Sequence, residues 1–216
     1  MKKSLALMLL SFALLLSGCP DTTTYSRGVY LLLDSSGTYR EELQKAQAII
    51  NYLLGTLESG DSLAVARIDS ASFSEKDIIA RMTFDRRPSV ANQQKRLFKQ
   101  KVDNFISTVK GSAYTDITGG MLQAVEYLNE TGAGKKIILI FSDLKEELVK
   151  GQIRDFPIEI SKCKVVALNV TKLRSDNVDP REYYKRVEAW KKRVEAGGGH
   201  WRVINDLERF DAILAE

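Results

Sequence analysis

The chain has 216 residues, of which 44% are hydrophobic and 28% are charged. This length and composition are those of one globular domain of ordinary type. The formal net charge of +4 indicates no particular partner and gives no support to nucleic-acid binding.

The first residues have the pattern of an export signal. Lys2 and Lys3 form a short positive head, and residues 5–16 form an apolar segment that is too short for a membrane span. The segment ends in Leu16-Ser17-Gly18-Cys19, which resembles the lipobox of bacterial lipoproteins. In that class the signal is cut before the cysteine, which then carries lipid. A plain signal peptide or an N-terminal anchor is the alternative.

Cleavage before Cys19 predicts residues 1–18 as a signal peptide and residues 19–27 as a lipidated tether. Lipid anchoring of this kind holds a protein on a membrane without spanning it. We therefore expect the folded domain in the bacterial cell envelope, outside the cytoplasm and on the periplasmic side. Loss of the two leader lysines lowers the net charge from +4 to +2. Cys163 is then left alone in an apolar run, which predicts a buried, inert thiol.

Strands and helices are expected to alternate after the tether. The unbroken apolar run 29–33 predicts a strand buried on both faces, as in a parallel sheet. The later elements are expected as a helix at 43–57, strands at 62–68 and 78–84, a basic helix at 90–109, a helix marked by Met121, Val125 and Leu128, strands at 136–141 and 164–170, a helix at 180–196, a strand at 200–204 and a short helix at 207–214. This order predicts an α/β fold: a Rossmann-like three-layer sandwich, with a mainly parallel central sheet and helices on both faces.

Oxygen-bearing side chains follow two of the predicted strands. Asp34, Ser36 and Thr38 follow the first strand at alternate positions, and Gly37 is expected to turn the backbone so that they converge. Asp143 follows a second strand, and Thr115 lies in a polar loop before the intervening helix. The carboxyl ends of parallel strands share one edge of a sheet, where α/β folds place ligands. Carboxylate and hydroxyl oxygens suit Mg²⁺ or Mn²⁺ rather than zinc.

Three pieces of the sequence together resemble a known metal site. They are Asp34-Ser35-Ser36-Gly37-Thr38, Thr115-Asp116-Ile117-Thr118-Gly119-Gly120 and Phe141-Ser142-Asp143. Their order and intervals resemble the metal-ion-dependent adhesion site of von Willebrand factor type A domains, over residues 28–216. The resemblance implies one cation, Mg²⁺ (or Mn²⁺ or Ca²⁺), bound by the hydroxyls of Ser36, Thr38 and Thr115 and by Asp34 and Asp143, directly or through water. It also implies an open coordination position for the acidic side chain of a protein partner, and no enzymatic activity.

Two positions depart from the family's pattern. Thr38 stands where serine is usual, and its extra methyl group stiffens the side chain. Asp143 is followed by Leu144-Lys145-Glu146-Glu147 instead of the common glycine. Glu146 or Glu147 is therefore expected either to crowd the site or to help hold the metal.

Two other functions compete with this interpretation. One is a scaffold without metal that binds through a surface such as the basic helix 90–109, although a charged run of this kind is usually a solvated face. The other is a metal-dependent hydrolase with Asp34 as nucleophile. The single histidine, His200, is far in sequence from Ser36, which favours a structural role for it over a catalytic one.

Overall fold

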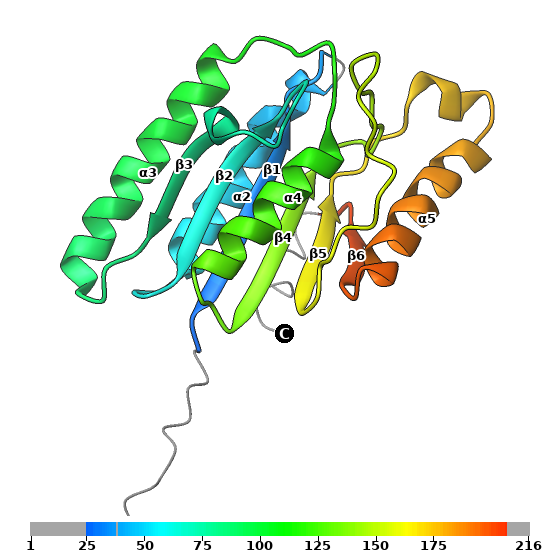
Figure 1. Cartoon of the computed structure of the whole chain (residues 1–216). Helices are drawn as coiled ribbons and strands as arrows, with labels where there is room; N and C mark the ends of the chain where they lie inside the picture. The colour runs from blue at the N-terminus through cyan, green and yellow to red at the C-terminus, as the bar shows by residue number, and fades with distance from the viewer. Residues whose placement is uncertain (1–24, 38, 207–216) are drawn as a thin grey trace, which may run out of the picture.

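The computed structural model describes residues 25–37 and 39–206, which form a sheet of six strands between two layers of helices (Figure 1). The strands are β1 (Arg27–Asp34), β2 (Ser62–Ile68), β3 (Ile78–Thr83), β4 (Lys135–Phe141), β5 (Cys163–Leu168) and β6 (His200–Ile204). Their order across the sheet is β3-β2-β1-β4-β5-β6. Every neighbouring pair is parallel except β2 and β3. The predicted α/β sandwich with a mainly parallel sheet is confirmed.

The helices cover the two faces of the sheet in pairs. They are α2 (Leu43–Thr56), α3 (Pro88–Thr108), α4 (Ile117–Glu130) and α5 (Arg181–Ala196), with short 3₁₀ turns at η1 (Arg40–Glu42), η2 (Glu75–Asp77) and η3 (Arg174–Asn177). Buried side chains of α2 and α3 pack on one face, and those of α4 and α5 pack on the other. In Figure 1, α4 and α5 lie in front of the sheet and α2 behind it.

The central strand β1 is buried on both faces, as its apolar run predicts. Val29, Leu31 and Leu33 point into the layer of α2 and α3. Tyr30 and Leu32 point into the layer of α4 and α5. Each large apolar side chain removed from water stabilises the fold by about 1.5–3 kcal/mol, so the end of β1 is a rigid place from which to present polar side chains.

Helix α4 lies close against this central strand. A Cβ atom added at Gly120 would lie 2.8 Å from Cδ2 of Leu32, so only glycine permits the observed approach. The start of α4 and the loop before it are thereby held at the carboxyl edge of the sheet.

Three local expectations differ from the structure or lie outside it. The helix expected around Met121, Val125 and Leu128 begins earlier, at Ile117, because the Asp116 side chain caps it there. The chain after residue 38 enters α2 through η1 rather than directly. The predicted helix at 207–214 lies outside the described residues.

Gly37 does not play the expected role in turning the backbone. Its φ angle is outside the left-handed range, and a Cβ atom there would meet nothing within 4 Å. Close packing instead requires Gly111, where an added Cβ atom would lie 3.2 Å from Cα of Gly37. The predicted reason for a glycine at residue 37 is therefore wrong.

Candidate functional site

Two carboxylate-bearing segments meet where β1 and β4 end. The strands are parallel neighbours with Leu33 opposite Phe141, so Asp34 and Ser142 leave the sheet side by side. The Ser142 hydroxyl donates a hydrogen bond of 2.6 Å to Oδ2 of Asp34. Asp143, the next residue, is buried, as is Asp34. The structure thus brings two of the predicted ligand residues to one edge of the sheet.

The turn after β1 is organised by Asp34 itself. Its Oδ1 accepts a hydrogen bond of 2.8 Å from the Ser36 backbone N–H, which is the local pairing that aspartate favours in turns. The segment 35–37 also pairs with the loop after α3: Ser112 N–H donates to Ser35 O at 2.8 Å, and Gly37 N–H donates to Ser112 O at 3.1 Å. Thr38, the third predicted ligand residue of this segment, lies outside the described residues.

Thr115 is fixed through its main chain and is buried. Its N–H donates to Glu147 O at 2.7 Å, and its carbonyl accepts from the Glu147 N–H at 2.9 Å. This antiparallel bridge ties the loop before α4 to the segment after β4, which carries Asp143. Within the described part of the chain, the Thr115 hydroxyl makes no hydrogen bond, so its oxygen remains available to a ligand.

Burial raises the pKa of both carboxylates. For Asp34 the cause is desolvation, partly offset by the hydrogen bonds from Ser142 and Ser36. For Asp143, desolvation and the nearby charge of Asp34 raise the pKa to about 6, against the lowering effects of the Lys145 N–H, Arg186 and Lys145. A raised carboxylate pKa means that burial and nearby negative charge outweigh the favourable contacts, so the ionised form is not fully compensated by positive charge. A bound cation would supply that charge.

The donor set fits a hard cation. Within residues 25–37 and 39–206 there is no group of three or more His, Cys, Asp or Glu residues placed to hold a metal. The candidate site instead combines carboxylate oxygens of Asp34 and Asp143 with hydroxyl oxygens of Ser36 and Thr115. Mg²⁺ accepts such oxygens together with retained water.

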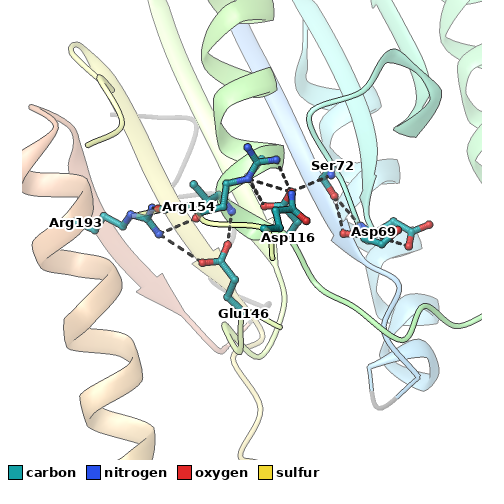
Figure 2. A network of polar contacts seen from close by, with 10 residues as sticks. Asp69, Ser72, Asp116, Glu146, Arg154 and Arg193 are labelled. Atoms are coloured by element: carbon teal, nitrogen blue, oxygen red, sulfur yellow. Dashed lines mark hydrogen bonds and ion pairs between the residues drawn. The ribbon is translucent and has the colours of Figure 1, made fainter. Parts of the chain in front are cut away.

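A network centred on Asp116 lies beside the site (Figure 2). Asp116 is buried, and its carboxylate accepts from the Gly119 N–H at 2.8 Å and the Ser72 N–H at 3.2 Å. It also binds Gln152 at 3.0 Å and pairs with Arg154 at 2.8 Å. This network joins the start of α4 to the loop after β2 and to the long connection between β4 and β5.

Sequence reasoning did not identify Asp116 or Arg154 as part of the site's surroundings. One signal was present: an aspartate directly before the first residue of an apolar helix is a typical N-cap. No pattern indicated Arg154, because it lies 38 residues away in an irregular loop.

Glu146 and Glu147 are accounted for without a role as metal ligands. Glu146 accepts a hydrogen bond of 2.7 Å from the Thr118 N–H and pairs with Arg193 at 3.5 Å. Glu147 pairs with Lys145 at 2.5 Å through its side chain and bridges Thr115 through its main chain. Its charge still contributes to raising the pKa of Asp34.

The remaining candidates have ordinary surroundings. Cys163 is a buried thiol whose pKa is raised by desolvation, as expected for an inert core residue. On the basic helix α3, Lys95 donates to Leu57 O and lies 5.4 Å from the centre of the Phe84 ring, and Lys99 pairs with Asp103 at 2.7 Å. Along the described chain, no helix has the length and apolar character needed to cross a membrane. Cys19 lies outside the described residues.

The comparisons with known proteins identify the family. The model of the von Willebrand factor type A domain matches residues 28–193, and the chain therefore belongs to this family. Domains of this family often mediate adhesion between proteins, commonly bind a divalent metal, and generally act as interaction modules rather than as enzymes. Among curated proteins, none matches the chain.

The solved structures that are similar to this chain are distant from it in sequence. The pilus adhesin SpaC from Lactobacillus rhamnosus GG has 11% identity and a TM-score of 0.54, over 90% of this chain and 30% of that chain. A von Willebrand factor type A protein from Catenulispora acidiphila has 14% identity and a TM-score of 0.48, over 85% of this chain and 39% of that chain. Manganese-loaded TRAP protein from Plasmodium vivax has 17% identity and a TM-score of 0.43, over 66% and 57%. The chain thus spans well under half the length of the first two proteins.

Proposed function

We propose that the chain is a protein-binding module that recognises a carboxylate of its partner through one divalent cation. The cation is Mg²⁺, with Mn²⁺ and Ca²⁺ as alternatives. The residues that would hold it are Asp34, Ser36, Thr38, Thr115 and Asp143. The module binds and releases its partner without chemical turnover.

The observation that carries this proposal is the pair of buried carboxylates at the carboxyl edge of the sheet. Asp34 and Asp143 form no ion pair with any lysine or arginine of residues 25–37 and 39–206, and burial raises the pKa of each. Buried carboxylates whose charge is not fully compensated are costly, and at Asp143 the nearby charges of Arg186 and Lys145 offset only part of the effect of burial, so such a pair is expected where a cation binds. Thr115 supports the same interpretation, because its main chain is bridged to Glu147 in the segment that carries Asp143.

Charge balance supports an acidic partner group. Asp34 and Asp143 together carry a charge of about −2 when ionised, which balances a divalent cation. A third carboxylate from a partner can then approach a nearly neutral centre, and Mg²⁺ tolerates exchange of a retained water for an oxygen ligand. The bound cation would supply electrostatic attraction for that carboxylate, while Ser142 and the Ser36 N–H keep Asp34 in position.

The lipid tether is a second part of the proposal. Residues 1–18 would be removed, and Cys19 would carry lipid that holds the domain on a membrane of the bacterial cell envelope, facing the periplasm. Incorporation of a labelled fatty acid into the full chain, with Cys19→Ala as the control, tests this part. Equal labelling of both chains would contradict it.

Cation binding is tested by isothermal titration and thermal unfolding after treatment with EDTA. We expect Mg²⁺ or Mn²⁺ to stabilise the chain by about 2.7 kcal/mol at a hundredfold excess over the dissociation constant, and to have no effect on Asp34→Asn. Asp61→Asn is the matched control, because Asp61 is buried at the opposite end of the sheet and should leave the cation response intact. No response to any divalent cation in the unsubstituted chain would leave a scaffold that binds through another surface.

Recognition of a carboxylate needs its own experiment. The immobilised chain is incubated with envelope extract in Mg²⁺ or in EDTA, and with extract whose carboxyl groups have been amidated by carbodiimide. We expect capture of a partner only in Mg²⁺ and only from the untreated extract. Capture that persists in EDTA or after amidation would contradict a metal-bridged carboxylate.

A further inference from the structure

Helix α5 presents three N–H donors toward the segment that follows β4. Arg186, Trp190 and Arg193 are spaced so that they share one face of the helix. Each donates to a backbone carbonyl: Arg186 Nε to Asp143 O at 2.8 Å, Trp190 Nε1 to Leu144 O at 3.0 Å, and Arg193 Nη2 to Arg154 O. The segment 143–154 is thereby fastened to α5 at both of its ends.

These donors are fixed by their own surroundings. Trp190 is 6% exposed, and its ring lies 5.3 Å from the guanidinium carbon of Arg193. Arg186 makes two further hydrogen bonds, of 2.8 Å and 3.2 Å, to the carboxylate of Asp176, which is also buried. A donor whose rotamer is locked by packing and by an ion pair defines the position of the carbonyl that it binds.

The backbone held by these donors is strained. Leu144 has a φ angle of +66°, a left-handed conformation that is unfavourable for a residue with a Cβ atom. Such a conformation persists where surrounding contacts determine it. The Arg186 guanidinium and the Trp190 indole bind the carbonyls of the two consecutive peptide groups that flank the Leu144 Cα, and the Leu144 N–H donates to the Ser142 hydroxyl at 3.0 Å. These contacts together determine the conformation of Leu144.

The third donor extends the contact to the other ligand-bearing loop. Arg193 Nη1 donates to the Thr118 hydroxyl at 2.7 Å and pairs with Glu146, which in turn accepts from the Thr118 N–H. Thr118 is in the first turn of α4, three residues after Thr115. One helix therefore touches both sides of the candidate site.

We propose that Arg186 and Trp190 are positioning residues through which helix α5 sets the place of Asp143 and hence the cation affinity of the site. This inference rests on the proposed function, since it requires that the site binds a cation. Neither residue is a ligand: both bind main-chain carbonyls and act through Asp143. The outer contacts of metal ligands are worth about 10–100-fold in metal affinity.

The test compares conservative variants of these two residues with a matched control. Arg186→Lys keeps a positive charge for Asp176 but loses the fixed Nε–H that binds Asp143 O. Trp190→Phe keeps an aromatic ring in the core and loses one N–H donor. Arg27→Lys is the control, because Arg27 likewise joins an aspartate to a carbonyl: it binds Asp61 at 2.7 Å and Thr56 O at 2.9 Å, at the opposite end of the sheet.

Mn²⁺ affinity is measured by isothermal titration on the full chain, at a temperature where circular dichroism shows every variant folded. We expect Arg186→Lys to weaken binding by about tenfold, Trp190→Phe to weaken it in the same direction, and Arg27→Lys to leave it unchanged. Unchanged affinity in both α5 variants would overturn the inference and leave the proposed function standing. An equal loss of Mn²⁺ affinity in Arg27→Lys would also overturn the inference, because it would show that any loss of stability weakens cation binding. No Mn²⁺ binding by the unsubstituted chain would overturn the proposed function, and the inference with it.

Discussion

The two ends of the sheet bury aspartates in opposite electrostatic conditions. At the amino end, Asp61 binds the Arg27 side chain at 2.7 Å and accepts from the main-chain N–H groups of Arg27 and Glu58 at 2.7 Å and 2.8 Å. At the carboxyl edge, Asp34 receives neutral donors, from Ser142 at 2.6 Å and Ser36 at 2.8 Å. One end is neutralised from within the chain, whereas the carboxylate at the other end has only neutral hydrogen-bond donors among the described residues.

This difference does not reflect a lack of arginine near the carboxyl edge. Arg154 pairs with Asp116 and Arg186 pairs with Asp176, each at 2.8 Å. These pairs hold the loops around the site, whereas the carboxylates of Asp34 and Asp143 have no such partner in the described chain. Aspartates paired with arginine around the site, beside two carboxylates that form no ion pair within the described residues, are what we expect of a cation site.

The largest expected effect separates the two ends by substitution. Asp61→Ala leaves Arg27 half-buried without its partner and should lower the free energy of unfolding by about 3–5 kcal/mol. Asp34→Asn, in EDTA at neutral pH, should change it by less than about 1 kcal/mol, because relief of a desolvated charge offsets a weakened hydrogen bond. Urea unfolding measures both. A large loss of unfolding free energy in Asp34→Asn would show that the ionised carboxylate stabilises the fold without a cation.

A smaller effect follows from the pKa of Asp143, which is raised to about 6 in the folded chain. An unfolded aspartate titrates at about 3.9, so Asp143 is most favourable to folding below that value. This favourable contribution to the free energy of unfolding is lost as the pH rises through about 6, and above that pH it no longer changes. As the pH rises from about 4 to about 7 in EDTA, the unsubstituted chain should therefore lose on the order of 2 kcal/mol of unfolding free energy that Asp143→Asn keeps.

The measurement is urea unfolding of both chains across that range, repeated with Mg²⁺. With Mg²⁺ at neutral pH, the unsubstituted chain should become the more stable of the two, because only it keeps the Asp143 carboxylate as a ligand for the cation. If the free energy of unfolding of the two chains changed with pH in parallel, this would contradict a raised pKa of Asp143 in the folded chain.

The smallest effect concerns the neutral donor to Asp34. Ser142→Ala removes the hydroxyl that binds Asp34 Oδ2 and should cost about 1 kcal/mol of unfolding free energy. If the loss equalled that of Asp61→Ala, Ser142 would hold its carboxylate as firmly as Arg27 holds Asp61, and the contrast between the two ends would fail.

The sequence predicted the fold because its strands are apolar runs with clear ends. The run at 29–33 stops at Asp34, and the run of β4 stops before Ser142, so the parallel pairing of two adjacent strands is enough to place both polar ends together. The convergence of Asp34 with the segment of Asp143 needed no knowledge of the loops.

The supports of the site could not be predicted in the same way. Arg154 reaches Asp116 from the irregular connection between β4 and β5, and its course has no periodicity that a sequence pattern could reveal. Trp190 lies in the predicted helix 180–196, where an aromatic side chain can either pack in the core or contact a partner, and its burial decides for the core. The capping role of Asp116 was within reach, since an aspartate directly before an apolar helical run is a known helix-start signal.

Anomalous diffraction from crystals of the chain soaked in Mn²⁺ tests the central claim most directly. The account predicts one anomalous peak at the carboxyl edge of the sheet, within ligand distance of oxygens from Ser36 and Thr115 and adjacent to Asp34 and Asp143. A peak elsewhere, or no peak at a Mn²⁺ concentration that stabilises the chain in solution, would contradict it.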